Sequence, residues 1–330
     1  MRADIIGFMC LGAVTCVAQE VWHDPSPHKV SFVTVENNVK LEVLDWGGNG
    51  RPLVLLAGYL TAHAYDDFAP KLSKFCHVYG ITRRGYGASS RPDSGYTAER
   101  SADDVLQVLD ALKLNSSVLV GHSFGGQDLD TIGAKHPDRV VGLVYLNSAE
   151  DPTLGPDDFG VQPPDAKQLP SVLRTSPPPD HSSFQAYRES QFREHGIRFP
   201  EAELRQTYST GSNGSVGHYL VPMSVRNAMF KGIQKPNYAA IRAAVLAFFA
   251  MPPVLADQIA QDKPKDDGER TALAQKYASD LAIVNRHMSD LKKGVPSARI
   301  IALPGANFYI FLSNETELLH EIARFLTDLK

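Results

Sequence analysis

The stretch VLVGHSFGG, from Val118 to Gly126, constrains the fold of this chain more than any other. It contains a Gly-x-Ser-x-Gly pattern centred on Ser123, after an apolar β-branched run and before a segment typical of a helix. In a strand–turn–helix of this kind the serine occupies a strained turn, and small residues two positions away let neighbouring backbone approach closely. Ser123 is therefore predicted to be a nucleophile facing a pocket, with the amide N–H of Phe124 pointing towards a developing oxyanion. The alternative is a glycine-rich loop with an incidental serine.

Four further segments combine apolar strand-like runs with glycine-rich or polar loops. They are PLVLLAG at Pro52–Gly58, VYGITRRGYGASS at Val78–Ser90, VVGLVYLNSAED at Val140–Asp151 and ARIIALPGANFYIFLS at Ala298–Ser313. Together with the Ser123 element they resemble the α/β-hydrolase superfamily, in that family's order, from about Val30 to the C-terminus. The resemblance gives each segment a role, in the order just listed. The first is the strand before the oxyanion loop, and the second is the next strand with its D-x-R-G-x-G-x-S turn. The third is the strand after the nucleophile helix, and the fourth is the last strand with its histidine loop. Thr82 stands where that turn commonly carries aspartate.

Strand and helix patterns alternate through most of the chain. Lys29–Leu44 alternates as an opening β-hairpin with its turn at Glu36-Asn37-Asn38. Ser101–Leu114 has one apolar helical stripe, and Ser101 is its expected N-cap. Because that helix lies between two apolar strands, it indicates a βαβ unit and a parallel sheet. The expected fold class is α/β, a mostly parallel doubly wound sheet of the α/β-hydrolase type with an inserted helical lid.

The alternation stops between Pro152 and about Asn237, where Pro, Gly and Ser become frequent. Short helical pieces occur there at Phe184–His195 and Glu201–Tyr208, and Ala239–Phe249 resembles the return to the sheet. With 330 residues, 43% of them hydrophobic, the chain can bury a core large enough for a domain with such an insertion. The expected organisation is a signal peptide at residues 1–18, a hydrolase core at 19–151 and 239–330, and a lid insertion at 152–238.

The N-terminal segment has the pattern of a secretory signal. Arg2 precedes an apolar run at Ile5–Val14, and a small-x-small cleavage site ends at Ala18. The run is too short for a stable membrane anchor. A periplasmic or secreted protein is therefore expected. The alternatives are a buried N-terminal helix in a cytoplasmic protein, and lipoprotein processing at Cys16.

The charge and cysteine content of the chain indicate which classes of binding partner to expect. A formal net charge of −4, with charges interspersed, gives no electrostatic case for nucleic acid. Paired Cys-x-x-Cys spacing, a common metal-binding signature, does not occur in the sequence. The expected partner is a small-molecule substrate, with no cofactor and no metal. The oligomeric state is not predicted.

The resemblance assigns the remaining parts of a hydrolase site. A second oxyanion donor is expected from the backbone N–H of Tyr59, with Leu60 the alternative. In most of the family the triad acid follows the strand expected at Val245–Phe249, but the next acid there is Asp257. Some branches carry the acid after the preceding strand, and there the chain offers Glu150 and Asp151. Glu150 and Asp151 are therefore both candidates for the triad acid. The alternative is that they are surface acids at the start of the lid.

The position of the catalytic base is occupied by Phe308. In the family a histidine typically stands three positions after the glycine that ends the last strand, and counting from Gly305 gives Phe308. The Ser-His-acid mechanism needs an imidazole to take the serine proton and return it to the leaving group. A phenylalanine ring can do neither, so an impaired or inactivated enzyme is expected.

Several histidines and two arginines elsewhere in the chain are further candidates for a role in the site. His63 follows the oxyanion strand and is a weak candidate base, whereas the side chain of His122 is expected to point to structural partners. His287 is expected at the surface of a polar helix, and Arg83-Arg84 are expected to be structural. Three more histidines fall in the lid: His181, His195 and His218.

The function expected from the resemblance is a serine hydrolase acting on a small ester, lactone or related carbonyl compound, impaired by Phe308. The alternative is a non-catalytic pseudo-hydrolase that binds a small apolar ligand, with Phe308 adding an apolar wall to the pocket. A lyase or cofactor-free oxygenase on the same fold ranks third, because a fold does not fix the chemistry.

Overall fold

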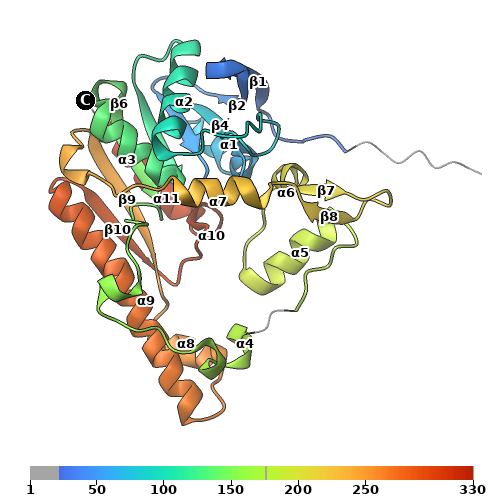
Figure 1. The fold of residues 1–330 in the computed structure, drawn as a ribbon, viewed down its shortest axis with the longest axis vertical. Helices are drawn as coiled ribbons and strands as arrows, with labels where there is room; N and C mark the ends of the chain where they lie inside the picture. The colour runs from blue at the N-terminus through green and yellow to red at the C-terminus, as the bar shows by residue number, and fades with distance from the viewer. Residues whose placement is uncertain (1–21, 175–176, 330) are drawn as a thin grey trace, which may run out of the picture.

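The computed structural model describes residues 22–174 and 177–329, so the predicted signal peptide at residues 1–18 lies outside the described part and stays a prediction. An eight-stranded sheet forms the centre of the molecule, in the order β1-β2-β4-β3-β5-β6-β9-β10 (Figure 1). Its strands are β1 Lys29–Val35, β2 Val39–Gly47, β3 Pro52–Leu56, β4 His77–Thr82, β5 Ser117–His122, β6 Val140–Leu146, β9 Ala244–Met251 and β10 Arg299–Pro304. Strand β2 runs antiparallel to β1 and β4, and the remaining neighbours are parallel. The predicted mostly parallel sheet is confirmed.

The opening hairpin also forms as expected. Strands β1 and β2 pair from Lys29 opposite Asp45 to Val35 opposite Val39, and the turn Glu36–Asn38 is a short 3-10 helix. Strand β2 is buried along most of its length because it continues into the sheet, whereas β1 is an exposed edge.

Helices cover both faces of the sheet. The α-helices of the described residues, only some of which lie on the sheet, are α1 Ala69–Leu72, α2 Ala98–Ala111, α3 Gly125–Lys135, α4 Ser171–Arg174, α5 Phe184–His195, α6 Glu201–Thr207, α7 Met223–Lys231, α8 Leu255–Asp262, α9 Asp267–Gly294, α10 Ile310–Ser313 and α11 Glu315–Asp328. Apolar side chains of α2, α3 and α9 pack on one face, and those of α1, α10 and α11 on the other. In β3, Val54 and Leu56 belong to the first core, and Leu53 and Leu55 to the second. A strand buried on both sides is therefore apolar throughout, which is why PLVLL was recognisable as a strand.

The helix predicted at Ser101–Leu114 begins earlier. Helix α2 starts at Ala98, and its N-cap is Thr97, whose side chain accepts a hydrogen bond from the backbone N–H of Arg100. Threonine and serine are both good N-caps, so the pattern alone could not choose between Thr97 and Ser101.

The insertion after β6 has two parts. The first, residues 152–174, runs along α9, and the Gln162 carbonyl accepts a hydrogen bond from the Gln275 amide. The second carries α5, α6, α7 and a small antiparallel pair, β7 Tyr208–Thr210 and β8 Val216–Tyr219, beside the ends of the central strands (Figure 1). Helices α5 and α6 coincide closely with the two helical pieces expected there. The domain boundaries themselves stay a prediction.

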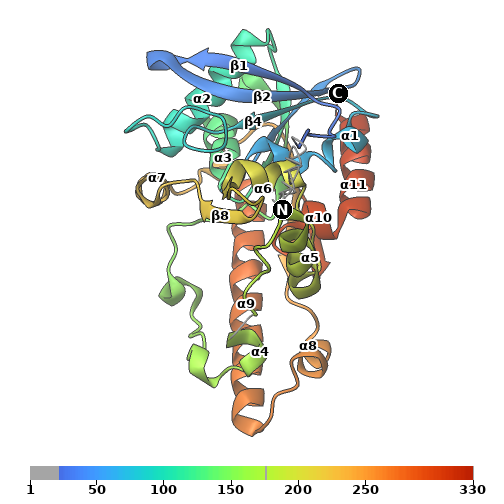
Figure 2. The same ribbon diagram turned by 90° about the vertical axis from the view of Figure 1, so that its right-hand side faces the viewer.

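A long helical extension was not predicted. Helix α9 has 28 residues, and its N-terminal part projects away from the sheet together with α8 and α4 (Figure 2). In the part of the chain that the structure describes, none of the helices combines the length and apolar character needed to span a bilayer.

Candidate active site

Ser123 lies in the predicted turn between β5 and α3. Its φ angle is +53°, a left-handed conformation that is rare for residues other than glycine. The backbone around it is tightly packed: a Cβ on Gly121 would lie 2.6 Å from the Gly125 carbonyl oxygen. Glycine at these positions is therefore what permits the sharp reversal, as a nucleophile elbow requires.

The oxyanion loop lies directly against this turn. A Cβ placed on Gly58 would be 2.7 Å from the Phe124 nitrogen and 2.8 Å from the Ser123 Oγ. Within residues 22–174 and 177–329, neither the Tyr59 nor the Phe124 backbone N–H donates a hydrogen bond. Both amides are thus available beside the serine hydroxyl, the arrangement that an oxyanion hole needs.

Phe308 follows β10 on the loop that the resemblance assigned to the base. The side chain of His122 reaches this loop: its Nε2 donates to the Phe308 carbonyl oxygen at 3.1 Å. Burial lowers the pKa of His122 to about 4, so the ring is neutral at neutral pH and serves as a structural donor. The His122 and Phe308 rings also meet edge to face, 4.9 Å between centroids. The backbone of residue 308 is therefore fixed to the residue before the nucleophile.

The two candidate acids have different surroundings. The Asp151 carboxylate accepts hydrogen bonds from the backbone N–H and the hydroxyl of Thr153, so it caps its own turn. Burial raises the pKa of Glu150, and among the described residues none donates a hydrogen bond to its carboxylate. Its charge also adds to the larger effect of burial in raising the pKa of Tyr59. Of the two candidates, Glu150 is thus the one whose carboxylate has no donor among the described residues, whereas Asp257 is exposed on α8.

The histidines correct one expectation. His287 was expected at the surface, but it is buried, and its Nδ1 accepts a hydrogen bond from the Asp151 backbone N–H at 3.2 Å. It is buried because 152–174 folds back along α9, which the helical pattern could not reveal. His63 cannot serve as base: burial alone would lower its pKa, but hydrogen bonds to Asp66 and Glu42 outweigh this and raise it to about 10.

A cavity of about 660 Å³ lies between the lid and the oxyanion loop. Tyr59 and Leu60 line it on the core side, and Tyr309 from the Phe308 loop closes another side. Of the lid histidines, His195 lines this cavity, while His181 and His218 are not among its lining residues. Ser123 does not line it, contrary to the expectation of a hydroxyl facing the pocket. Tyr59 stands at the boundary, since its ring also packs on Phe124 at 4.6 Å.

Glu203 joins the lid to the oxyanion loop, a role that the sequence did not suggest. This carboxylate, on α6, accepts hydrogen bonds from the backbone N–H and hydroxyl of Thr61 and from the hydroxyl of Thr207. It is almost fully buried, and burial raises its pKa to about 7. In sequence, Glu203 looked like an ordinary acid on a short amphipathic helix. Its partner Thr61 lies 142 residues away, so only the fold brings them together.

The raised pKa of Glu203 predicts a pH-dependent stability. Because the folded state holds this proton more tightly than the unfolded state, its contribution weakens the fold as pH rises from about 4.5 to about 7. A shift of this size is worth on the order of 3 kcal/mol. Glu203→Gln should therefore reduce the loss of unfolding free energy between pH 5 and pH 7.5, measured by urea denaturation. Glu201→Gln, in the same helix but paired with Arg205 near the surface, should change that loss little. A parent-like pH dependence in Glu203→Gln would contradict the expectation.

The cationic side chains near the site divide into paired and unpaired groups. Arg83 bonds to the Asp128 carboxylate at 2.8 Å, and Arg84 forms a two-pronged pair with Asp104, so both are structural, as expected. Arg226, on α7, lines the cavity and makes no ion pair with a described residue. Its Nε is buried without a hydrogen-bond partner, and its guanidinium lies 5.6 Å from the centre of the Tyr59 ring.

Comparison with known proteins gives a consistent assignment. The alpha/beta hydrolase family profile matches residues 53–319. A 2-(acetamidomethylene)succinate hydrolase from Mesorhizobium japonicum is 30% identical over 37% of this chain and 44% of its own length. A 2-hydroxymuconate semialdehyde hydrolase from Pseudomonas sp. is 37% identical over 31% of this chain and 38% of its own length. The chain thus aligns with less than half of each of these curated relatives.

Solved structures resemble the chain over most of its length. The crystal structure of E-2-(acetamidomethylene)succinate hydrolase superposes with a TM-score of 0.65 and 17% identity, covering 91% of this chain and 99% of that one. The N-acyl homoserine lactone degrading enzyme Est816 superposes with a TM-score of 0.56 and 20% identity, over 91% and 100% of the two chains. These likenesses concern the fold. Since the family profile covers more than half of the sequence, the chain belongs to the alpha/beta hydrolase family.

Proposed function

We propose that this chain is a serine hydrolase for a small ester, lactone or related carbonyl substrate, with catalysis impaired because Phe308 replaces the base. The observation that carries the proposal is the strained turn at Ser123 beside the unbonded amides of Tyr59 and Phe124. A non-glycine residue in this left-handed conformation costs free energy, and such strain is typical of functional sites.

The proposed chemistry follows from these groups. The Ser123 Oγ attacks the substrate carbonyl carbon, and the two backbone amides stabilise the negative charge on its oxygen. The serine proton must then pass to water, because Phe308 cannot accept it. Collapse of this tetrahedral intermediate breaks the ester C–O bond and releases the alcohol, and water then hydrolyses the acyl-serine to the free acid. An enzyme that has lost one triad member keeps roughly 10³–10⁴-fold acceleration over water from the oxyanion hole and binding. Slow turnover is therefore the expected state of the chain, and an ester and lactone panel on the parent and on Phe308→His tests the proposal.

The acid role falls to Glu150 in this proposal. Its carboxylate has no donor among the described residues, whereas Asp151 is occupied by Thr153. A carboxylate at this position would orient an imidazole at residue 308 and stabilise its charged form.

Arg226 narrows the class of substrate. An unpaired guanidinium beside a lid cavity is suited to a carboxylate, which it can bind through charge-assisted hydrogen bonds. The name of one related hydrolase contains succinate, which is a carboxylate compound. We therefore propose a carbonyl substrate that carries a carboxylate group.

Replacing Arg226 should discriminate between acidic and neutral substrates. In the Phe308→His background, Arg226→Gln is expected to raise KM for a carboxylate-bearing ester roughly 10-fold or more, since a hydrogen bond to a charged group is worth about 1.5–3 kcal/mol. KM for the neutral ester of the same acyl group should change little. Arg205→Gln, which removes a lid arginine paired with Glu201, is the matched control. Equal effects of Arg226→Gln on both esters would contradict a carboxylate-binding role.

The second candidate function is a pseudo-hydrolase that binds a small apolar ligand. The Phe308 ring is 45% exposed and packs on His122, but it does not line the cavity, so the apolar wall expected from it is not found there. The cavity does have apolar lining residues, among them Leu60 and Phe199, and these favour an apolar ligand. Titration of apolar esters separates the two functions. Saturable binding without turnover, in both the parent and Phe308→His, would support the binding module.

A further inference from the structure

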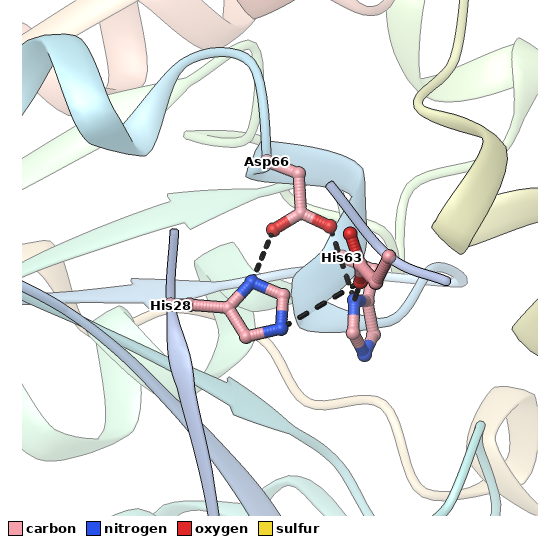
Figure 3. A group of neighbouring side chains, drawn as sticks. His28, His63 and Asp66 are labelled. Atoms are coloured by element: carbon pink, nitrogen blue, oxygen red, sulfur yellow. Dashed lines mark hydrogen bonds and ion pairs between the residues drawn. The ribbon is translucent and has the colours of Figure 1, made fainter. Parts of the chain in front are cut away.

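A cluster of histidine and aspartate side chains lies outside the candidate active site. Four side chains of types that can bind a metal converge where the segment before β1 meets the short 3-10 helix Ala62–Tyr65. Figure 3 labels three of them, His28, His63 and Asp66. This His–Asp cluster consists of Asp24, His28, His63 and Asp66. One ligand atom from each lies within 4.8 Å of all the others. We propose that the His–Asp cluster is a structural zinc site.

The ligand separations fit a tetrahedral ion. The Asp24 Oδ2 lies 3.6 Å from the His28 Nε2 and 3.3 Å from the His63 Nδ1. The His63 Nδ1 lies 3.0 Å from the Asp66 Oδ2. For bonds of about 2.0–2.1 Å, neighbouring ligands of a tetrahedral zinc ion are about 3.3 Å apart. These three separations are close to the tetrahedral value, and all four ligand atoms lie within 4.8 Å of one another, so the side chains would draw together around an ion.

The outer hydrogen bond of His63 supports the same assignment. With the His63 Nδ1 facing the ion, its Nε2 lies 3.4 Å from a carboxylate oxygen of Glu42. A metal-bound histidine usually donates its second ring N–H to a carboxylate, which fixes the ring and its tautomer. The His63 imidazole has such a carboxylate in place, because Glu42 lies outside the cluster. The His28 Nδ1 lies 2.8 Å from the Asp66 Oδ1, and this contact has to open for the Asp66 carboxylate to turn onto an ion bound at the His28 Nε2.

The surroundings also select the metal. Two imidazole nitrogens and two carboxylate oxygens suit zinc, whereas calcium and magnesium prefer oxygen ligands alone. Three of the four side chains are almost fully buried, and Asp24 is 23% exposed, which leaves an entry path on one side. Four protein ligands leave no position for a substrate, so the ion would stabilise the fold and would not take part in the reaction.

A zinc ion at the His–Asp cluster would link the segment before β1 to the oxyanion loop. Asp24 and His28 belong to the segment before β1, and His63 lies five residues after Gly58 in the loop that supplies the oxyanion donor. Zinc would therefore hold the segment before β1 against this loop. This inference does not depend on the proposed hydrolase function.

The test is metal binding by the folded, full chain. Protein stripped with EDTA and freed of chelator should take up one zinc ion per chain in a calorimetric titration with ZnCl2, and its Tm should rise. His28→Ala should bind roughly 100-fold more weakly or not at all. His77→Ala, which removes a histidine paired with Asp45 outside the cluster, should bind like the parent. Folded stripped parent that takes up no stoichiometric zinc would overturn the proposal, as would His28→Ala binding as tightly as the parent.

A second readout checks the geometry without relying on affinity. The Co²⁺-loaded parent should show the intense visible absorption of a tetrahedral ion, and His28→Ala should lack it. Glu42→Gln, which keeps the shape but weakens the outer hydrogen bond to His63, should lower zinc affinity by about 10–100-fold. A weak spectrum typical of six-coordinate cobalt in the parent would refute the four-ligand site.

Discussion

Phe308→His should raise the rate of ester hydrolysis by about 10²–10⁴-fold over the parent chain, because this is the typical contribution of general acid–base catalysis. The backbone of residue 308 is already positioned: its carbonyl accepts a hydrogen bond from His122, the residue before the nucleophile. The Phe308 side chain is 45% exposed, so an imidazole replaces it without opening a hole in the core. The measurement is kcat/KM on a panel of activated esters and lactones at pH 7–8.

Four further variants make this result specific. Phe308→Ala removes the ring without supplying a base, and should stay close to the parent rate. The double variant Ser123→Ala with Phe308→His should lose the gain, because the imidazole then has no hydroxyl to activate. Glu150→Gln in the Phe308→His background should lose part of it, whereas Asp151→Asn should cost less because the Asp151 carboxylate is bonded to Thr153.

Two outcomes would count against a missing base. One is no gain from a folded Phe308→His, which would favour the binding module. The other is brisk turnover by the parent that disappears on His195→Ala, because His195 lines the cavity and its carbonyl bonds to Asn307, next to Phe308.

Local patterns were sufficient for the fold because the signals that define it are local. The apolar run of β3 is buried on both faces, and Gly121 packs against the Gly125 carbonyl four residues later. The hairpin β1–β2 closes through a three-residue turn. The polar helix around His287 was expected, but its length and its extension were not. Its polar sequence resembles any solvated helix until residues 152–174 are seen to pack along it.

The candidate site was predictable only where the family pattern names the residue. Ser123, Phe124 and Tyr59 lie together, and Phe308 is tied to the elbow by His122. The remaining groups depend on contacts between distant segments. Glu203 meets Thr61 across 142 residues, and His28 meets Asp66 across 38. The type of such a residue does not reveal which distant residue it will contact. Neither the raised pKa of Glu203 nor the His–Asp cluster could therefore be predicted from the sequence.

Gly58→Ala should abolish most of the activity gained by Phe308→His. The new methyl group would lie 2.6 Å from the Ser123 Cβ and 2.7 Å from the Phe124 nitrogen, where atoms in proteins essentially never approach. The elbow or the oxyanion loop must shift, and the Phe124 N–H can then no longer reach the oxyanion. Loss of one oxyanion donor costs about 10²–10³-fold in kcat, so kcat in Gly58→Ala with Phe308→His should fall by that factor, with a smaller change in KM.

The control separates this local effect from a general loss of stability. Gly155→Ala adds the same methyl group where the nearest heavy atom is 3.9 Å away, and it should leave the rescued kcat unchanged. Overpacking at Gly58 is expected to cost about 1–3 kcal/mol in unfolding free energy, so thermal melting should still show a cooperative, folded protein at assay temperature. A folded Gly58→Ala variant that keeps the full rescued rate would show that the oxyanion is stabilised elsewhere. In that case the unbonded amides of Tyr59 and Phe124 would be a consequence of the fold and not part of a catalytic site.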